Sequence, residues 1–385
     1  MIILCEPICI GFEHVEFNST FIKIVEMCLN DKITFFGEVT HITYVKNILE
    51  QNEHNNYNKN IIYESVEIPE RLKSRMGRFP KEYRLIRDLL NYASSNHVKY
   101  VIFTSITSSA LAAIKILLRK FKDIKVLVIP HSELDLITQI PLSRDLFFWF
   151  RWWLKYFNHP NLKYLLLGES LRDELIKELP ELADISEYID FPLVFKNYDV
   201  SNLDYSQLKF GFLGVGSMRK GFEDFLKLSN DIKTKFKEKD ISFVLVGHVI
   251  DESLQVDDNL IEIISESPLE EDEYYLRINE MDYILFLHKP EYYRFTASGV
   301  FTDAISCIKP VIAIENPFLK YYFDLMGDIG YLCSSTQEIR EVIEEIIINP
   351  DPERYAQQQL NILQKREKFS VEKISDKFKT ILDNF

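Results

Sequence analysis

Short runs of β-branched and aliphatic residues alternate with longer amphipathic segments along nearly the whole chain. This alternation is typical of βαβ units, in which parallel strands are joined by helices that cover the sheet. In the first half, strands are predicted at residues 2–5, 33–36, 100–104, 125–129 and 163–167. In the second half, they are predicted at 209–213, 242–246, 261–263, 283–287, 311–313 and 330–332. The pattern therefore predicts an α/β fold with two parallel sheets.

The segments between these strands are predicted to be helices, at residues 18–29, 42–51, 81–95, 108–121, 170–179, 221–237, 270–280, 299–307 and 336–348. The polar stretch 51–60 breaks this rhythm and is predicted to be an exposed, mobile loop. Pro192 and many turn-forming residues place a linker at 191–207. We expect two doubly wound, Rossmann-like domains facing each other across a cleft, at 1–195 and 205–350, with a helical tail at 351–385 that packs back on the first domain.

Composition narrows the classes of partner and compartment. The chain of 385 residues has 45 Lys and Arg against 59 Asp and Glu, a net charge of -14, which argues against nucleic acid as a partner but leaves room for a local basic site. Five Cys, an odd and sparse number, indicate thiols in a reducing compartment. The first residues lack the features of a signal peptide, and no apolar run approaches the roughly 18 residues of a membrane span. We expect a cytoplasmic protein, with peripheral membrane association as an alternative.

The stretch FGFLGVGSMRKGFEDFL, residues 210–226, runs from a predicted buried strand through a glycine-containing loop into a helix. Glycine permits close approach of a ligand to the backbone, and the helix start offers N–H groups to an anion. The stretch matches neither the Walker motif nor the complete Rossmann fingerprint, so an ordinary tight turn with solvated basic residues remains the alternative. The candidate phosphate-binding residues here are Gly214, Gly216, Ser217, Arg219 and Lys220.

A second candidate stretch, residues 288–313, begins where another predicted strand ends. Ser298 and Gly299 open a helix, where the aligned peptide dipoles favour phosphate oxygens. Arg294 could neutralise a diphosphate, and Asp303, one turn into the helix, could accept hydrogen bonds from ribose hydroxyls. The alternative is an N-cap followed by an ordinary amphipathic helix.

Together these two stretches resemble the C-terminal nucleotide-sugar domain of the GT-B glycosyltransferases, particularly the family-4-like enzymes (glycosyl transferases group 1). The shared elements are a glycine-rich loop ending in Lys-Gly, a D-x-x-L strand, an acidic residue before Ala, and a Lys-Pro-Val turn. They stand here at Lys220-Gly221, Asp282 to Leu285, Asp303-Ala304 and Lys309-Pro310-Val311. The resemblance covers about residues 209–345, whereas the N-terminal half matches only in its α/β rhythm.

The resemblance implies transfer of a sugar from a nucleotide-sugar donor to the hydroxyl of a glycan or lipid-linked acceptor, as in polysaccharide or glycolipid assembly. By the same resemblance, Lys220 contacts the donor diphosphate, Arg294 and the backbone of Ser298 and Gly299 contact the phosphates or sugar, and Asp303 contacts the ribose. Because basic residues can stabilise the departing diphosphate, neither a metal nor a cofactor is expected.

Three positions depart from the family pattern. The usual glutamate before Ala is Asp303, the usual glycine of the turn before Lys309 is Ile308, and the glutamate eight residues before the ribose ligand falls at Phe295. A noncatalytic partner subunit of the same fold therefore stays an alternative. A nucleotide-sugar epimerase of the same architecture is the other.

Candidate catalytic residues of the first half follow predicted strands, at the sheet edge where ligands usually bind. His131, in IPHSELD, could polarise a hydroxyl, or it could simply be a hydrogen-bonded loop histidine. Glu13 and His14 follow the first strand and could act as a general base. A base there would suit an inverting enzyme, whereas the family likeness alone implies retention.

The segment LFFWFRWWLKYF, residues 146–157, contains all three Trp of the chain. A helix so rich in aromatic residues, with Arg144, Arg151 and Lys155, could lie in a membrane interface or hold a hydrophobic acceptor. The alternative is a helix buried against the sheet.

Overall fold

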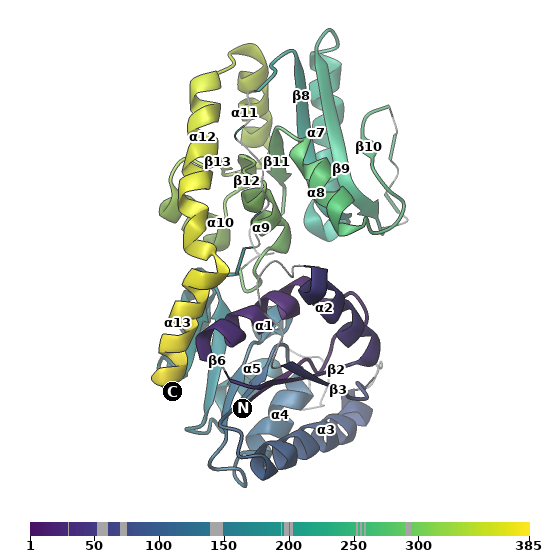
Figure 1. The fold of residues 1–385 in the computed structure, drawn as a ribbon. Helices are drawn as coiled ribbons and strands as arrows, with labels where there is room; N and C mark the ends of the chain where they lie inside the picture. Colours follow the sequence, from purple (N-terminus) through teal and green to yellow (C-terminus); the bar gives the residue numbers. More distant parts are fainter. Residues whose placement is uncertain are drawn as a thin grey trace. The chain divides into compact units, whose positions relative to one another are not determined.

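The computed structural model describes residues 1–29, 31–51, 61–69, 75–138, 149–193, 195, 200, 203–251, 253–254, 256–257, 259–288 and 294–385. The predicted mobile loop at 51–60 lies outside these residues, apart from Gln51. The chain forms two compact units (Figure 1). The first unit contains Met1–Pro192, Phe295–Ala297 and Val371–Phe385, and the second contains Leu193–Arg294 and Ser298–Ser370.

The described part of the first unit contains a seven-stranded parallel sheet with the strand order β3-β2-β1-β4-β5-β6-β7. The strands are β1 (Ile2–Cys5), β2 (Ile33–Gly37), β3 (Ile61–Ser65), β4 (Tyr100–Phe103), β5 (Lys125–Val128), β6 (Leu162–Leu167) and β7 (Ser186–Ile189). The order reverses between β1 and β4, which makes their carboxyl ends the topological switch point where doubly wound sheets bind ligands.

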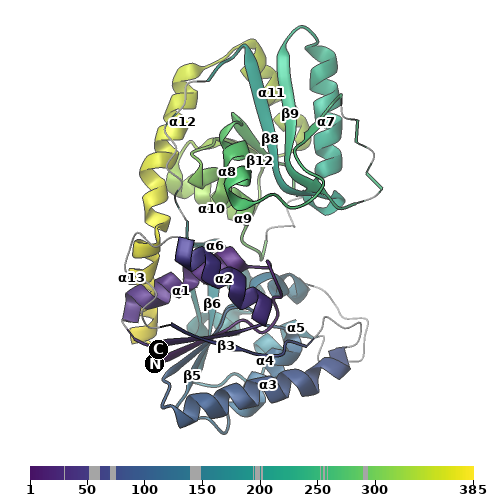
Figure 2. The same cartoon turned by 45° about the vertical axis from the view of Figure 1, so that its right-hand side comes forward.

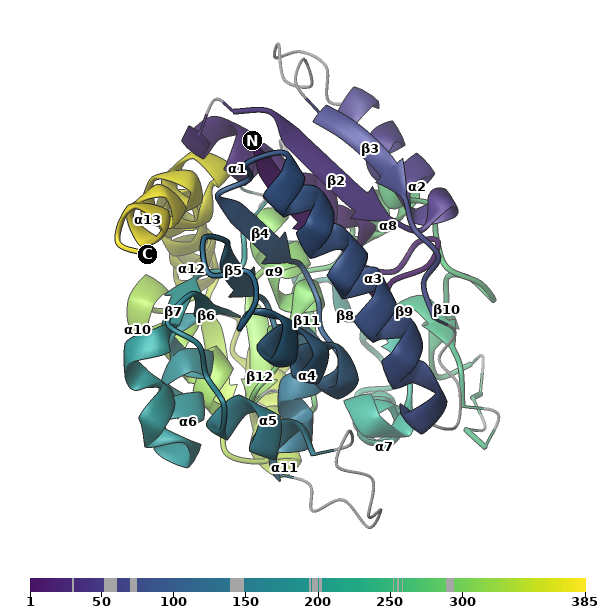
Figure 3. The ribbon, with the colours of Figure 1, turned by 90° about the horizontal axis from the view of Figure 1, so that it is seen from below.

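Helices cover this sheet, and α3 lies beside α4 (Figure 3). The helical elements are α1 (Val15–Leu29), α2 (Val39–Gln51), α3 (Arg75–Ser95), α4 (Ser108–Leu117), η1 (His131–Thr138), α5 (Phe150–Lys155), α6 (Glu169–Glu178), η3 (Pro180–Ile185) and α13 (Val371–Asp383). The C-terminal helix α13 packs against α1, far from it in sequence.

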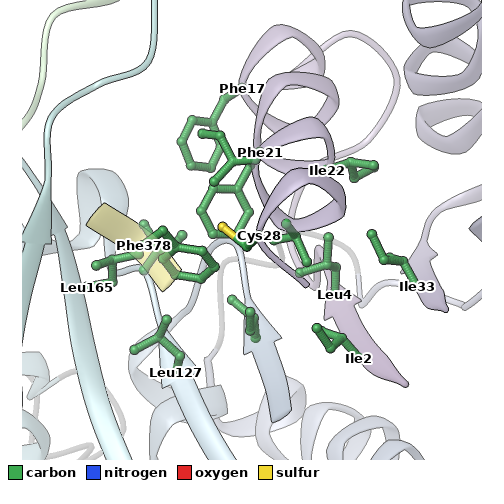
Figure 4. Close-up of a cluster of buried hydrophobic side chains, with 14 of the residues drawn as sticks. Ile2, Leu4, Phe17, Phe21, Ile22, Cys28, Ile33, Leu127, Leu165 and Phe378 are labelled. Atoms are coloured by element: carbon green, nitrogen blue, oxygen red, sulfur yellow. The ribbon is translucent and has the colours of Figure 1, made fainter. Parts of the chain in front are cut away.

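The contact between α1 and α13 forms part of a buried hydrophobic core (Figure 4). The rings of Phe21 and Phe378 meet edge to face, with centroids 5.3 Å apart, and both side chains are fully buried. The Cys28 thiol donates to the Ser375 carbonyl at 2.8 Å. Burying a Phe side chain contributes about 1.5 to 3 kcal/mol, so the last helix of the chain stabilises the first unit.

The second unit contains, in its described part, a six-stranded parallel sheet with the order β10-β9-β8-β11-β12-β13. The strands are β8 (Gln207–Gly216), β9 (Asp240–Val249), β10 (Glu262–Ile263), β11 (Tyr283–Phe286), β12 (Val311–Ile314) and β13 (Gly330–Cys333). Strands β8 and β9 run side by side over their full length (Figure 2). Here the switch point lies between β8 and β11.

The helices of the second unit include the first part of the predicted tail, up to Ser370. They are η4 (Met218–Lys220), α7 (Phe222–Lys235), α8 (Glu271–Asn279), α9 (Gly299–Ser306), α10 (Pro317–Met326), α11 (Thr336–Ile348), α12 (Pro352–Lys365) and η5 (Arg366–Phe369). The tail was expected to pack on the first domain, but α12 belongs to the second unit, where buried Tyr355 meets the ring of Tyr283 at 5.2 Å. Only α13 packs on the first unit.

The prediction of two Rossmann-like domains is confirmed by the two parallel sheets and their strand orders. Strands β3 and β7 and helix α10 were not predicted. The edge strand β3 is only partly buried, so it lacks the continuous apolar run that identifies a central strand.

The described part of the aromatic segment begins at Trp149, so Arg144 lies outside it. Helix α5 buries Phe150, Trp153 and Leu154, while Tyr156 and Phe157 after it are 45% and 53% exposed. Within the described residues, no helix combines the length and the apolar character that crossing a membrane requires.

Candidate functional site

The end of β8 and the turn after it depend on glycine at two positions. Gly214 has φ +78°, and a Cβ there would lie 3.2 Å from Cγ1 of Val300 in α9 and 3.8 Å from the Lys220 ammonium. Gly221 has φ +79°, and a Cβ there would lie 2.2 Å from the Leu287 carbonyl oxygen, which a real side chain could not tolerate. The loop after β8, the end of β11 and the first turn of α9 therefore meet at the switch point.

Gly216, the last residue of β8, and Ser217 complete this turn. A Cβ at Gly216 would come within 3.2 Å of the Phe222 ring, so glycine allows α7 to pack close to the end of β8. Ser217 is buried, and its carbonyl accepts the N–H groups of Lys220 and Phe222 at 3.1 Å each. Arg219, next to Lys220, is exposed.

Lys220 lies at the centre of this arrangement. Burial lowers the pKa of its ammonium, and the charge of Arg219 lowers it further, whereas Asp303 acts in the opposite direction. Lys220 is therefore a partly desolvated cation beside a second cation, Arg219. An anionic ligand would bind favourably there, because its negative charge would offset that of the two cations. The first turn of α9 contributes its dipole at the same place.

His288 lies two residues after the end of β11 and was missed as a candidate by sequence reasoning. It is buried, and burial, with the neighbouring Lys220 charge, lowers its pKa to about 3, so the imidazole is neutral at physiological pH. The sequence could have identified it, because it places this histidine immediately after the strand predicted at 283–287, where ligands usually bind.

Helix α9 carries the second group of predicted donor-binding residues. The Ser298 hydroxyl is buried and accepts the Phe301 N–H at 3.2 Å, so it serves as the N-cap of the helix. Gly299 is exposed and has open space around its Cα. A ligand at this helix start would therefore meet the backbone of Gly299 and Val300, whereas the Ser298 hydroxyl is engaged. Arg294 is half-buried, and it is the last residue of the segment Leu193–Arg294 of the second unit.

Asp303 is held by two tyrosines of α8. Its carboxylate accepts from the hydroxyls of Tyr274 and Tyr275, both at 3.1 Å. The structure thus brings Gly214, Lys220 and Asp303 together with the start of α9. Such a set can bind a phosphate-containing ligand and a hydroxyl-bearing group beside it.

Ile308, one of the departures from the family pattern, retains the left-handed backbone expected of a glycine, with φ +58°. Its side chain is 1% exposed. It lies two residues beyond the C-terminal end of α9, and the helix, about 12 Å long, separates it from Gly299. The isoleucine therefore changes the packing behind the helix and does not alter the helix start.

In the first unit, the carboxyl ends of β1 and β4 are joined through Glu6. This fully buried carboxylate accepts from the N–H groups of Ile8 and Cys9 at 2.9 and 3.1 Å. It also accepts from the hydroxyls of Thr104, at 3.0 Å, and Ser105. Burial by itself would raise the pKa of Glu6, but the nearby His14 and the hydrogen bonds outweigh it, and the pKa is lowered. Glu6, which sequence reasoning missed, is an ionised anchor at the switch point.

Glu6, Cys9 and His14 are residue types that ligate metals, and their ligand atoms all lie within 4.8 Å of one another. Both Glu6 oxygens already accept hydrogen bonds, and Nδ1 of His14 lies 3.4 Å from the Cys9 sulfur. The cluster therefore has an internal structural role in holding the loop after β1. All five cysteines of the chain are buried thiols.

Of the three predicted catalytic residues, His14 and His131 come together. Their rings stack with centroids 4.5 Å apart, and the Phe17 ring meets His131 edge-on at the same separation. Burial lowers the pKa of His131 well below its usual value, and His14 lowers it further. Nε2 of His131 is buried and has no hydrogen-bond partner among the described residues, so it is available to a hydroxyl. Glu13 is exposed on the preceding turn.

The segment Phe295–Ala297, assigned to the first unit, lies beside His131. A small cavity of about 30 Å³ is lined by His131, Phe191 and Phe295, among others. The Thr296 hydroxyl donates to the Asp135 carboxylate at 2.9 Å. The position at which the family pattern has glutamate thus contributes an apolar wall next to the candidate histidine.

No family model matches this chain, and no curated protein is similar to it in sequence. Solved structures are similar in fold. HepE of Anabaena in complex with UDP and glucose is 14% identical, with 100% of this chain and 99% of that chain covered and a TM-score of 0.67. A glycosyltransferase of Rickettsia africae is 15% identical, with 99% and 97% covered and a TM-score of 0.65.

Trehalose-6-phosphate synthase OtsA is also similar, at 8% identity, with 100% and 99% covered and a TM-score of 0.68. An E. coli structure bound with UDP-2-fluoro-glucose gives the same values. At these identities the likeness concerns the fold, and it spans the whole of each chain. The chain has the GT-B fold of these glycosyltransferases.

Proposed function

We propose that this chain is a glycosyltransferase that moves a sugar from a nucleotide-sugar donor, with a uridine diphosphate leaving group, to an acceptor hydroxyl. The observation that carries the proposal is the position of the Lys220 ammonium beside Gly214 and the first turn of α9. In that place a cation, a close-approach glycine and a helix N-terminus can act on one diphosphate. The similar structures that contain UDP or UDP-glucose support a uridine donor.

The proposed chemistry follows from where charge develops. As the glycosidic bond breaks, negative charge grows on the diphosphate, and Lys220, with Arg219 and Arg294, would stabilise it without a metal. Asp303, oriented by its two tyrosines, would accept from the ribose hydroxyls. Such preorganised groups need little rearrangement during the reaction, which is why they lower the barrier.

On the first unit, we propose that His131 contacts the acceptor hydroxyl or the transferred sugar, because its neutral imidazole has a buried nitrogen available for a hydrogen bond. His14 would hold the ring of His131 in place by stacking. Glu13 is exposed, so it would act as a general base only if the hydroxyl of a bound acceptor lay next to its carboxylate.

Calorimetry with UDP, GDP, ADP and CMP in the presence of EDTA tests the donor assignment. We expect UDP to bind and chelation to leave its affinity unchanged. Loss of UDP binding on chelation would contradict the metal-free mechanism, and absence of binding by all four nucleotides would contradict the proposal as a whole.

Release of UDP from UDP-glucose and other UDP-sugars then separates an enzyme from a noncatalytic subunit. The noncatalytic alternative is worth testing because Phe295 stands where the family pattern has a glutamate, so that position has no carboxylate. Slow hydrolysis of the donor that is abolished by Lys220→Ala would support the transferase. Tight UDP binding with no turnover of any donor would support the subunit.

We also propose peripheral membrane contact through residues 146–157, as expected for a lipid-linked acceptor in polysaccharide or glycolipid assembly. The exposed rings of Tyr156 and Phe157 support it, since they cluster with Trp152 at 5.5 and 5.3 Å. Arg151 and Lys155 already pair with Glu178 and Glu181, so apolar contact would contribute more than charge. Co-sedimentation with neutral and anionic vesicles tests this, and we expect Phe157→Ser to weaken it for both.

A further inference from the structure

A cavity of about 490 Å³ opens in the first unit, and none of the candidate site residues described above lines it. Its walls come from the end of β2, from the residues that follow β3, and from one face of α3. Because the strands of this sheet are parallel, the ends of β2 and β3 belong to the same carboxyl edge as Glu6 and His131. This edge is where doubly wound sheets bind ligands.

The floor of the cavity is apolar and the rim is charged. Phe36 and Tyr92 meet edge to face with ring centroids 5.4 Å apart, and buried Leu89 lies next to them. Lys81 and Arg84, three residues apart on α3 and therefore on neighbouring positions of one helix face, line the rim and are exposed. An apolar floor with charged groups at its edge suits a small molecule that has both a ring or chain and a charged group.

The two cations are available for a ligand. Asp88, which also lines the cavity, is bound by Arg87 through two hydrogen bonds of 2.7 and 2.9 Å. Within the described part of the chain, Lys81 and Arg84 form no ion pair, although the acidic residue Glu67 lines the same cavity. Helix α3 is thus a local basic element in a chain whose net charge is -14.

The cavity adjoins the candidate acceptor side of the site. Strand β2 pairs directly with β1, so their carboxyl ends are about 4.8 Å apart. The segment after β2 contacts the loop after β1, since Nδ1 of His41 lies 2.9 Å from the Gly11 carbonyl oxygen. A ligand in the cavity could therefore extend along the sheet edge toward His14.

We propose that this cavity binds the acceptor through a phosphate monoester, with Lys81 and Arg84 as its clamp and the Phe36–Tyr92 floor beneath the attached ring or chain. This inference rests on the proposed function, because it names the acceptor class of the same enzyme. Guanidinium and ammonium groups are the side chains that proteins use to bind phosphate, and Arg adds paired donors in a fixed geometry. The phosphate could belong to a soluble sugar phosphate or to a prenyl phosphate.

Calorimetry on the full chain with glucose 6-phosphate, farnesyl phosphate and glucose tests the proposal. We expect one of the two phosphates to bind and glucose to bind at least tenfold more weakly. Binding of glucose 6-phosphate alone would identify a soluble acceptor, and binding of farnesyl phosphate alone a lipid-linked one. Absence of binding by both phosphates would overturn the proposal.

The double variant Lys81→Ala/Arg84→Ala should weaken binding of that phosphate about a hundredfold, because each charged hydrogen bond contributes about tenfold in affinity. The matched control is Lys120→Ala/Lys122→Ala, which removes the same charge from exposed positions before β5 begins, at the opposite edge of the sheet. Equal loss in both variants would mean a general charge effect and would overturn the clamp.

UDP binding distinguishes this inference from the function on which it rests. The Lys81→Ala/Arg84→Ala variant should keep the affinity of the wild type for UDP, since the proposed donor residues belong to the second unit. A protein that binds UDP and hydrolyses a UDP-sugar but binds neither phosphate would refute the clamp and leave the transferase intact. Failure to bind UDP would refute the transferase itself.

Discussion

His14 and His131 stack at the carboxyl edge of the first sheet, with ring centroids 4.5 Å apart and planes inclined by 27°. Both residues have a left-handed backbone, with φ of +55° and +36°, which residues other than glycine rarely adopt. Such conformations cluster at functional sites because the surrounding structure must impose them. Two stacked histidines with strained backbones next to the ionised Glu6 support our proposal that this edge is the catalytic side of the first unit.

The stack predicts that His131 stays neutral at physiological pH. Burial, and then the neighbouring His14, lower its pKa, so folding excludes a proton that the unfolded chain binds below about pH 6.5. Stability should therefore fall as the pH drops below that value, and His131→Gln should reduce the dependence. An NMR titration of the ring protons checks this, with the variant used for assignment. A His131 signal that titrates near pH 6.5 would contradict the prediction.

The same variant should lower turnover about 10² to 10⁴-fold, the usual contribution of a positioned acid or base. Its affinity for UDP should stay within about twofold of the wild type. Steady-state kinetics and calorimetry measure the two quantities. An equal loss of both would indicate a structural effect of the substitution.

Glu6→Gln should destabilise the first unit by about 1 to 3 kcal/mol. Both Glu6 oxygens accept hydrogen bonds, so the NH₂ group of a glutamine would replace one acceptor and face another donor. A buried polar group left without a hydrogen bond costs about 1 to 3 kcal/mol. Because the folded pKa of Glu6 is lowered, its contribution is present above pH 4.5 and is lost as the pH falls further.

Urea unfolding at neutral and acidic pH measures the effect of Glu6→Gln. Glu13→Gln is the matched control, since Glu13 is exposed and its substitution should change the free energy of unfolding by less than about 0.5 kcal/mol. Similar midpoints for both variants would show that Glu6 does not hold the switch point.

Lys220→Ala should weaken UDP binding at least tenfold and reduce turnover about 10² to 10³-fold, because the ammonium would lie on the leaving diphosphate. Lys227→Ala is the control, since Lys227 is exposed on α7 and pairs with Glu223 at 2.7 Å. Calorimetry and UDP-release kinetics separate binding from catalysis. Near wild-type values for Lys220→Ala would contradict the diphosphate assignment.

Asp282→Asn should stabilise the second unit at neutral pH. Burial raises the pKa of Asp282 to about 6, although its carboxylate accepts the Lys209 N–H at 2.7 Å. The folded state therefore disfavours the ionised form, so Asp282 decreases stability above about pH 6 and has no such effect below about pH 4.

The stabilisation by Asp282→Asn should reach up to about 3 kcal/mol at pH 8 and disappear near pH 4, where the wild-type carboxyl is protonated in both states. The asparagine oxygen can still accept the Lys209 N–H. Thermal unfolding across this pH range measures it, with the exposed Asp272→Asn as control. A variant that is less stable than the wild type at pH 8 would refute the prediction.

The alternation of short apolar runs and amphipathic segments was enough to predict both sheets, because central parallel strands are buried on both faces and their composition shows it. The edge strand β3 was not predicted, because it is only partly buried and combines apolar with polar residues. The segment from Gly214 to Gly221 was predictable for a related reason, because local backbone geometry determines where glycine is needed.

The remaining parts of the site depend on contacts between distant segments, which local patterns do not encode. Glu6 meets Thr104 and Ser105 across the switch point, and His14 meets His131 from another strand end. The sequence by itself determined which elements form and where each turns. Only tertiary structure decided which strand ends become neighbours, because strand order arises from the packing of complete βαβ units, and that order brings these side chains together.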